Sequence, residues 1–244
     1  MTTLSALIVG HGRMGRLIEK LAPSYGIEIT GIVTSRTGRA DLALSRFHRL
    51  DIIFEFTNAS AFIGNLEALC GLGAPLVVGT TGWSERETAV RAAVQRADIA
   101  AVFAPNFSVG ANVLEAVAAS TAMLIAQDED YGAFVHEAHH AAKTDAPSGT
   151  AKALVAALER AGYRRPLDVS ATRAGHIPGI HTVGFDGPSE TITLTHSVRD
   201  RATFARGALH AARWVQGKQG WFTMRDVLGI TEGAPLVPGP CHGR

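Results

Sequence analysis

The chain has 244 residues, of which 46% are hydrophobic and 18% are charged, and its formal net charge at pH 7 is +1. A chain of this length and composition can bury a substantial core, as one large domain or two small ones. A charge so close to zero provides no general attraction to nucleic acid or to a membrane surface, so we expect neither as a partner.

The two cysteines, Cys70 and Cys241, lie far apart in the sequence and match no metal or disulfide framework. The apolar run near the N-terminus follows no basic segment, and it is too short for a signal peptide or a membrane span. We therefore expect a cytoplasmic protein in a reducing compartment.

The first predicted strand leads directly into a glycine-rich turn. Leu4 to Val9 form a short apolar run typical of a buried parallel strand, and a helical pattern follows from Arg16 to Leu21. Between them lies G-x-G-x-x-G, in which the glycines allow a tight turn and a close approach to a pyrophosphate. The predicted cofactor-binding residues here are Gly10, Gly12, Arg13, Met14 and Gly15.

The second predicted strand, Ile27 to Val33, leads to the residues that distinguish the two nicotinamide cofactors. A site specific for NAD usually has an acidic residue at this position, which holds the ribose hydroxyls. Here the chain has Ser35 and Arg36, and an arginine can pair with a 2′-phosphate. This favours NADPH over NADH; the alternative is that Arg36 is a solvated loop charge.

Strand and helix patterns then alternate as far as residue 106. We predict strands at 51–56, 75–78 and 99–104 and helices at 59–69 and 85–96, the second helix capped by Ser84 with Glu87 completing a capping box. This alternation indicates a doubly wound, Rossmann-type parallel sheet, whose ligands bind beyond the carboxyl ends of the strands. The further predicted cofactor-binding residues at those ends are Gly79, Thr80, Thr81, Ala104, Pro105, Asn106 and Phe107.

The pattern changes after Phe107. Helices are predicted at 113–126, 151–161 and 202–215, and strands at 131–136, 167–173, 179–185 and 191–197. Thr191 to His196 alternate strictly, which predicts a strand with one buried and one solvated face. We expect a smaller α+β domain with an open mixed sheet.

The segment from His136 to Ala151, HEAHHAAKTDAPSGTA, concentrates chemically active residues. Its three histidines can titrate near neutral pH, and Lys143 is one of only four lysines in the chain. Pro147 resists helix continuation, and Ser148 or Thr150 can cap the helix that follows. The backbone N–H groups at such a helix start attract carboxylates.

Three readings of this segment compete. The residues His136-Glu137-Ala138-His139-His140 satisfy the H-E-x-x-H zinc motif, with Glu159 as a third ligand. That motif requires one continuous helix, whereas the residues before His136 are strand-like, so we predict no metal. The second reading is that the histidines have no chemical role.

In the third reading, Lys143 and the backbone of Gly149 and Thr150 bind a dicarboxylic substrate, and a histidine donates a proton during reduction by the cofactor. Histidine suits this role because its pKa lies near the operating pH.

The motif Glu137-x-His139-His140-x-x-Lys143-x-Asp145-Ala-Pro-Ser-Gly-Thr150 resembles the signature of the dihydrodipicolinate reductase family, also called 4-hydroxy-tetrahydrodipicolinate reductase. The resemblance extends to about Leu228. The other similar blocks, in chain order, are Gly12–Gly15, Gly79–Gly82, Asn106–Gly110, Arg173–His181 and Met224–Leu228.

The resemblance implies a role for each matching residue. His139 is expected to be the proton donor and Lys143 its catalytic companion, while His140 and the backbone of Gly149 and Thr150 bind the substrate carboxylates. Residues 1–106 and 216–244 are expected to form the dinucleotide-binding domain, and residues 107–215 the substrate-binding domain through which a homotetramer assembles.

The implied activity is NADPH- or NADH-dependent reduction of 4-hydroxy-tetrahydrodipicolinate to tetrahydrodipicolinate, a step of lysine and diaminopimelate biosynthesis. Two alternatives remain at this stage. One is a related reductase of another imine or amino dicarboxylate, and the other is a redox-inactive nucleotide-binding homologue.

Overall fold

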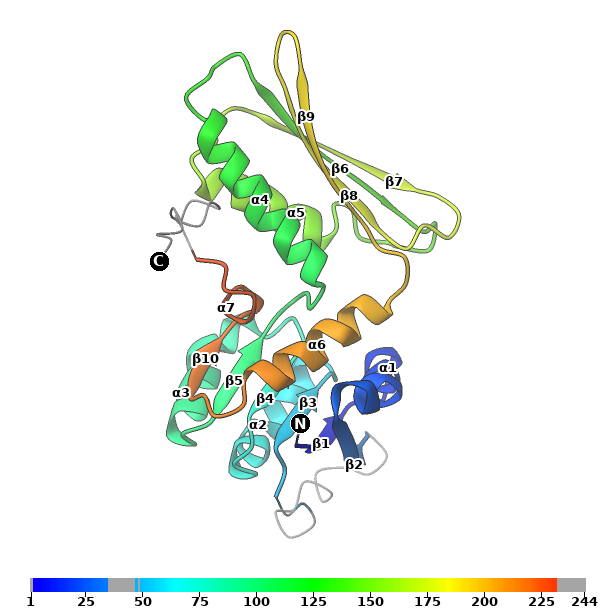
Figure 1. Cartoon of the computed structure of the whole chain (residues 1–244), viewed down its shortest axis with the longest axis vertical. Coiled ribbons are helices and arrows are strands. Elements are labelled where there is room, and N and C mark those ends of the chain that lie inside the picture. The colour runs from blue at the N-terminus through cyan, green and yellow to red at the C-terminus, as the bar shows by residue number, and fades with distance from the viewer. Residues whose placement is uncertain (1, 35–46, 48, 232–244) are drawn as a thin grey trace, which may run out of the picture. The chain divides into compact units, whose positions relative to one another are not determined.

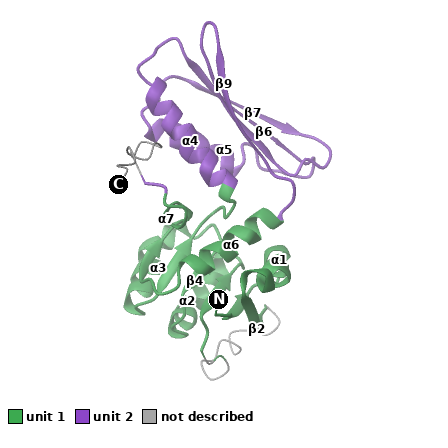
Figure 2. Ribbon diagram, viewed as in Figure 1, with its two compact units in different colours: residues 1–109, 202–229 green, residues 110–201, 230–244 purple. Residues whose placement is uncertain are grey.

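A computed structural model describes residues 2–34, 47 and 49–231, so Arg36 lies outside the described residues. The chain forms two compact units, residues 1–109 with 202–229 and residues 110–201 with 230–244 (Figure 2). The first unit resumes at Ala202, earlier than the expected residue 216. The reason is that Ala205, Leu209 and Ala212 pack into the core of that unit.

The first unit contains a six-stranded sheet with the order β10-β5-β4-β3-β1-β2, in which every neighbouring pair is parallel. Its elements are β1 (Leu4–Val9), α1 (Arg13–Leu21), η1 (Ala22–Tyr25), β2 (Ile27–Val33), β3 (Ile52–Glu55), α2 (Ala59–Gly71), β4 (Leu76–Val78), η3 (Ser84–Arg86), α3 (Glu87–Arg96), β5 (Ala100–Phe103), α6 (Ala202–Trp214), β10 (Gly220–Phe222) and α7 (Met224–Val227). The predicted Rossmann-type sheet is confirmed.

Both faces of this sheet are buried, which explains why its central strands are continuously apolar. Ile8 and Phe54 pack in one cluster with α1 and α6, whereas Leu7 and Ile53 pack in another with α2 and α3. Figure 1 shows these two helix pairs on opposite sides of the sheet. Because neighbouring residues of a strand point to opposite faces, every position of β1 and β3 after Ser5 is buried.

The predicted cap at Ser84 is wrong. Ser84 begins the short 3₁₀ turn η3, and α3 begins at Glu87 after Arg86, whose side chain makes no capping hydrogen bond. The neighbouring helix α2 has the expected kind of cap, because the side chain of Asn58 accepts a hydrogen bond from the N–H of Ala61 at 3.0 Å.

The second unit contains a four-stranded mixed sheet with the order β7-β6-β8-β9. Its elements are α4 (Val109–Ile125), β6 (Gly132–His139), α5 (Gly149–Arg160), β7 (Leu167–Arg173), β8 (Ile180–Asp186) and β9 (Thr191–Ser197). Strands β6 and β7 are parallel, and the other two neighbouring pairs are antiparallel. The predicted mixed sheet is confirmed.

Among the described residues, helices cover only one face of the second sheet. Val135 and Val183 pack against Leu114 of α4 and Leu154 of α5, and Figure 1 shows both helices on the same side of the sheet. The opposite face carries the exposed threonines of β9, so the sheet is open, as the alternation of that strand predicted.

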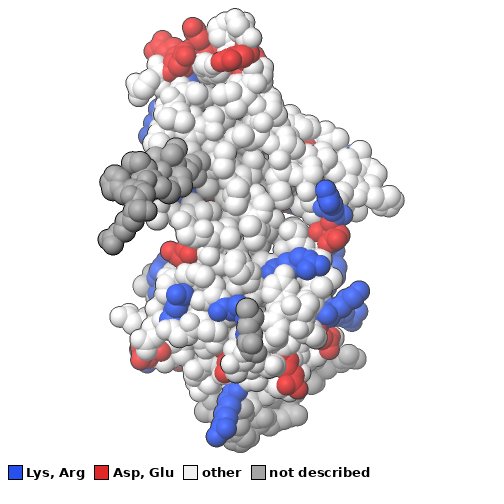
Figure 3. Space-filling model, in the orientation of Figure 1, with Lys and Arg blue, Asp and Glu red and all other residues white. Residues whose placement is uncertain are grey.

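No helix among the described residues is both long and apolar enough to cross a membrane. On the face shown in Figure 3, lysine and arginine side chains of the first unit are interspersed with aspartate and glutamate.

Candidate active site

Two of the three glycines in the turn between β1 and α1 leave no room for a side chain. Gly10 has φ +97°, and a Cβ there would lie 2.4 Å from the carbonyl oxygen of Phe56. A Cβ on Gly15 would lie 2.2 Å from the carbonyl oxygen of Gly10, so the third glycine lets α1 pack against the turn. At Gly12 a Cβ would meet nothing within 4 Å, which leaves its backbone open to a ligand.

A cavity of about 720 Å³ opens at this turn. It is lined by the turn, by the ends of β1, β2 and β3, and by the first turns of α2 together with Asn58, the N-cap of that helix. His11 and Arg16 also line it, although the sequence did not single them out as cofactor residues. Its volume, its open glycine backbone and the N-terminus of α1 fit a dinucleotide with an anionic pyrophosphate.

The other predicted cofactor-binding residues that the structure describes do not line this cavity. Among the residues of α1, Arg13 is exposed and Met14 packs against the core. The segments Gly79–Thr81 and Ala104–Phe107 follow β4 and β5, at the same edge of the sheet, but they do not line this cavity. Phe107 is buried, and its ring centroid lies 5.7 Å from that of Phe56.

Two loops at this edge are joined by one hydrogen bond, and a second one supports the loop after β4. The N–H of Thr57 donates to Oγ1 of Thr80 at 2.8 Å, and Nε1 of Trp83 donates to the carbonyl of Thr80 at 2.6 Å. A Cβ on Gly79 would lie 2.1 Å from the ring of Phe56, so the two loops are also closely packed. The loops after β3 and β4 therefore form one supported surface.

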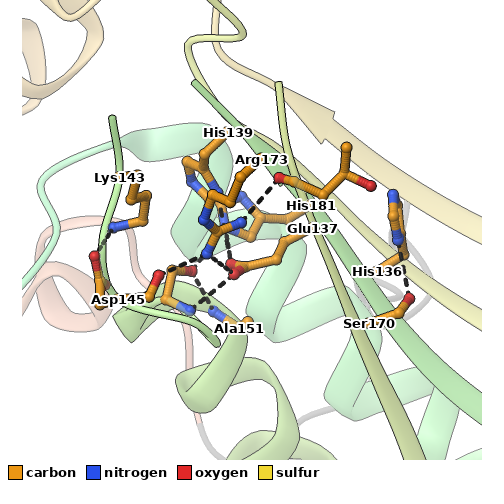
Figure 4. A network of polar contacts seen from close by, with 11 residues as sticks. His136, Glu137, His139, Lys143, Asp145, Ala151, Ser170, Arg173 and His181 are labelled. Carbon is orange, nitrogen blue, oxygen red and sulfur yellow. Dashed lines mark hydrogen bonds and ion pairs between the residues drawn. The ribbon is translucent and has the colours of Figure 1, made fainter. Parts of the chain in front are cut away.

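The second unit holds a buried polar cluster at the end of β6, shown in Figure 4. Glu137 is completely buried, and its Oε1 accepts hydrogen bonds from the N–H of Ser148 at 3.0 Å and from Nη2 of Arg173 at 2.5 Å. Burial alone would raise the pKa of Glu137, but these two hydrogen bonds outweigh it and lower the pKa. Glu137 is therefore a buried carboxylate that stays charged.

Two imidazoles lie near the other oxygen of Glu137 without forming a hydrogen bond to it. Its Oε2 lies 3.7 Å from Nδ1 of His139 and 3.6 Å from Nε2 of His181, and the two rings meet edge to face with centroids 4.9 Å apart. Burial lowers the pKa of His139 and, together with the neighbouring His139, lowers the pKa of His181 to about 4. Both imidazoles are thus neutral at pH 7 without a ligand.

Strand pairing explains why these residues meet. Glu137 and His139 are two residues apart on β6 and therefore point to the same face. In the sheet register, His139 pairs with Arg173 of β7, and Glu137 pairs with His181 of β8. The sequence singled out His139, but it did not assign roles to Glu137, Arg173 and His181, whose meeting depends on this register.

Lys143 lies in the loop after β6, where its Nζ is 2.6 Å from Oδ1 of Asp145. Nη2 of Arg173 donates to the backbone carbonyl of Asp145 at 2.6 Å, which fixes this loop against the cluster. The hydrogen bond from Lys143 lowers the pKa of Asp145. The loop therefore presents the ammonium group of Lys143, whose partner Asp145 is largely exposed.

Helix α5 begins beside the cluster. Ser148 is its N-cap and accepts a hydrogen bond from the N–H of Ala151 at 3.2 Å, while its hydroxyl lies 3.2 Å from Nε2 of His181. Gly149 and Thr150 form the first turn, and nothing lies within 4 Å of a Cβ on Gly149. His140, just after β6, is half-buried.

The zinc-protease motif does not form. His136 lies on a strand and points to the other face of the sheet, where its Nδ1 is 2.9 Å from Oγ of Ser170 (Figure 4). A different set, Glu137, His139 and His181, has ligand atoms within 4.8 Å of one another and could hold a metal ion. The guanidinium of Arg173 on the same carboxylate opposes a second cation there.

Comparison with known families accounts for both units. Residues 4–107 match the profile of the dihydrodipicolinate reductase N-terminus, and residues 110–228 match that of its C-terminus. The chain belongs to the dihydrodipicolinate reductase family. The resemblance identified in the sequence is thus confirmed.

Curated relatives in this family carry the name 4-hydroxy-tetrahydrodipicolinate reductase. One from Thiobacillus denitrificans is 38% identical over 94% of this chain and 100% of its own length. Another from Methanoregula boonei is 37% identical over 90% of this chain and 95% of its own length.

A solved structure, dipicolinate-bound dihydrodipicolinate reductase from Paenisporosarcina sp. TG-14, shares the fold with a TM-score of 0.74 at 17% identity. It covers 94% of this chain and 100% of the solved chain. An amine dehydrogenase from Mycobacterium smegmatis has a TM-score of 0.58 at 11% identity, over 92% of this chain and 96% of its own. The likeness to these two structures concerns the fold.

Proposed function

We propose that this protein reduces 4-hydroxy-tetrahydrodipicolinate to tetrahydrodipicolinate, with loss of water, in lysine and diaminopimelate biosynthesis. The observation that carries the proposal is the cluster of His139, Lys143 and Arg173 beside the N-terminus of α5, in a chain of this reductase family. An imidazole, two cations and a helix start together suit a small dicarboxylic substrate.

The cofactor of the proposed reaction is a reduced pyridine dinucleotide, which supplies the hydride when it is bound. Gly10 and Gly12 would let the backbone approach its pyrophosphate, and the N-terminus of α1 would favour the negative charge. We favour NADPH over NADH because Arg36 can pair with a 2′-phosphate. Arg36→Ala should then weaken NADPH binding more than NADH binding, and an equal loss for both would contradict this preference.

Substrate binding would use the loop after β6 and the start of α5. Lys143 would exchange its exposed partner Asp145 for a substrate carboxylate. The N–H groups of Gly149 and Thr150 would bind a carboxylate at the positive end of α5, with His140 beside them.

His139 would deliver the proton to the carbon next to the one that accepts the hydride. Without substrate, burial keeps the pKa of this imidazole low, and Lys143 and Arg173 reinforce the effect. The negative charge of a bound dicarboxylate would offset these cations and raise the pKa. Proton delivery would in this way be tied to substrate occupancy, and Glu137 would support the imidazolium when it forms.

The decisive assay follows the oxidation of NADPH and of NADH with freshly made product of the preceding synthase as substrate. The proposal expects steady turnover that persists after exhaustive chelation of metal ions. Absence of turnover with both cofactors would indicate a redox-inactive homologue, and loss of activity on chelation would point to a metal-dependent enzyme. Faster turnover of another imine or amino dicarboxylate would reassign the substrate.

We also propose a cytoplasmic homotetramer that assembles through the open face of the second sheet. The face includes exposed Thr191, Thr193 and Thr195 of β9, and a sheet surface that no helix of the described residues covers suits association with a copy of itself. Thr193→Arg would place like charges against each other across such an interface. Light scattering should then give a mass below the expected four chains; an unchanged mass would contradict the assigned surface.

A further inference from the structure

Glu55, the last residue of β3, is a buried acid that the proposed reaction does not use. Its side chain is completely buried, and its backbone lies between Val9 of β1 and Val78 of β4. One carboxyl oxygen, Oε1, accepts a hydrogen bond from the hydroxyl of Thr57. The other, Oε2, has no hydrogen-bond partner among the described residues. An ionised carboxylate in such a place has only part of the compensation that buried charges require.

The position of Glu55 connects it to the cofactor cavity. Thr57, which binds its carboxyl group, lines the cavity and donates its own N–H to Oγ1 of Thr80 at 2.8 Å. Thr80 belongs to the loop after β4, which Trp83 supports through its indole N–H. Glu55, Thr57 and Thr80 therefore form a chain of hydrogen bonds that joins two loops at the edge of the sheet where the cavity opens.

The surroundings of Glu55 favour its uncharged form. Burial raises its pKa to about 7, and the hydrogen bonds of Thr57 and Thr80 only partly oppose this. The strands beside it contribute Val9 and Val78, and the helices packed on this face contribute apolar side chains. Among the described residues, no charged group contributes to this pKa.

We propose that Glu55 is a proton-dependent positioning residue of the cofactor cavity, which holds Thr57 and Thr80 in place when uncharged and weakens dinucleotide binding when ionised. This rests on the proposed function, in which the cavity takes an anionic dinucleotide. An ionised Glu55 would place a negative charge that is only partly compensated close to that ligand. Its stronger hydrogen bonds would also draw Thr57, which lines the cavity, toward the interior.

The test measures the dissociation constant of NADH between pH 6 and pH 8.5. NADH is the right probe because the 2′-phosphate of NADPH itself ionises near pH 6. For the wild type, the dissociation constant should rise above pH 7 by up to about tenfold per pH unit, since one proton is involved. In Glu55→Gln, which keeps the shape without the charge, it should stay near the low-pH value. Glu28→Gln, an exposed glutamate on β2, is the matched control and should follow the wild type.

A second variant separates Glu55 from the histidine in the cavity. His11 lines the cavity, and its Nε2 lies 2.7 Å from Oε2 of Glu19, so its imidazole is the side chain that must be tested beside Glu55. His11→Asn should keep the rise above pH 7. If the rise disappears in this variant, the titrating group is His11 and the proposal is overturned, even if Glu55→Gln fails to fold.

The outcomes also separate this inference from the proposed function. If Glu55→Gln keeps the wild-type pH dependence, the role of Glu55 is wrong while the dinucleotide site stands. If the wild type binds NADH equally well at every pH, the inference is again overturned. If neither NADH nor NADPH binds the wild type at any pH, the proposed function fails as well.

Discussion

Arg173 and Glu137 form an ion pair across β7 and β6, with Nη2 of the arginine 2.5 Å from Oε1 of the glutamate. The carboxylate is completely buried, and the side chain of Arg173 is 17% exposed. The same guanidinium nitrogen holds the backbone of Asp145, so a single side chain supports both the charge beside His139 and the loop that carries Lys143.

Removal of Arg173 should therefore lower the stability of the folded protein. Arg173→Ala leaves Glu137 buried without its cation, and we expect the free energy of unfolding to fall by about 2 kcal/mol. This loss is smaller than that for breaking a fully buried ion pair, because Arg173 is partly exposed. Urea denaturation followed by circular dichroism measures this. The control is Arg160→Ala, whose ion pair with Glu115 is exposed and should contribute less than about 1 kcal/mol. Equal losses for both variants would contradict the argument.

His139→Gln should lower kcat by about 10²–10⁴-fold with little change in KM, because the proton is needed in the transition state. The matched control is His136→Gln, three residues earlier on the same strand, whose side chain points to the other face and contacts Ser170. Steady-state kinetics at saturating cofactor measure both parameters. Near-normal turnover in His139→Gln would remove this residue from the acid role.

Lys143→Ala should reduce both the rate and the substrate affinity, because a substrate carboxylate loses its cationic partner. A charge-assisted hydrogen bond of this kind is worth about 1.5–3 kcal/mol, which corresponds to a rise in KM of roughly 10–100-fold. Lys152→Ala, an exposed lysine on α5, is the control and should leave both parameters unchanged. If Lys143→Ala behaves like this control, Lys143 lies outside the substrate site.

The pH dependence of catalysis should differ between free and occupied enzyme. The parameter kcat/KM reports the free protein, in which burial lowers the pKa of His139 below its usual 6.5. Because the acid is active when protonated, kcat/KM should already be falling with rising pH at neutrality. The parameter kcat should begin to fall at higher pH, since bound carboxylates raise this pKa. Coincident pH profiles of the two parameters would contradict the proposed link between substrate binding and proton delivery.

The sequence predicted the local features of this protein better than the long-range ones. The turn at Gly10 and the cap at Ser148 depend on neighbouring residues, and both could be located from short motifs. Arg173 lies 36 residues from Glu137, and their contact depends on the pairing of β6 with β7. A one-residue shift of that register would turn Arg173 to the other face of the sheet.

Helix boundaries were also harder to predict, because they depend on contacts with residues far away in the sequence. Helix α4 begins at Val109 rather than at Val113, and its first turn contains Gly110, whose close packing the sequence alone does not reveal. A Cβ on Gly110 would lie 2.7 Å from the ring of His196, on the far strand of the sheet. Glu55 was likewise read only as part of a strand, since its burial depends on the helices that cover the sheet.

The raised pKa of Glu55 also makes the stability of the first unit depend on pH. The folded state retains this proton up to about pH 7, whereas the unfolded chain loses it near the ordinary glutamate pKa of 4.5. The folded state therefore binds more protons between these two values, and the free energy of unfolding should fall as pH rises through this window, by on the order of 3 kcal/mol.

All three tryptophans, Trp83, Trp214 and Trp221, lie in the first unit, so their fluorescence in urea reports the unfolding of that unit. The stability of the wild type should fall relative to that of Glu55→Gln as pH rises from about 4.5 to about 7, because only the wild type has a buried acid that keeps its proton in the folded state. His181 has a lowered pKa, which works in the opposite direction, but it belongs to the second unit, whose unfolding these tryptophans do not report. Parallel stability curves for the two proteins would mean that Glu55 is already ionised in the folded state at pH 5, and the pH-dependent role assigned to it would fall with that result.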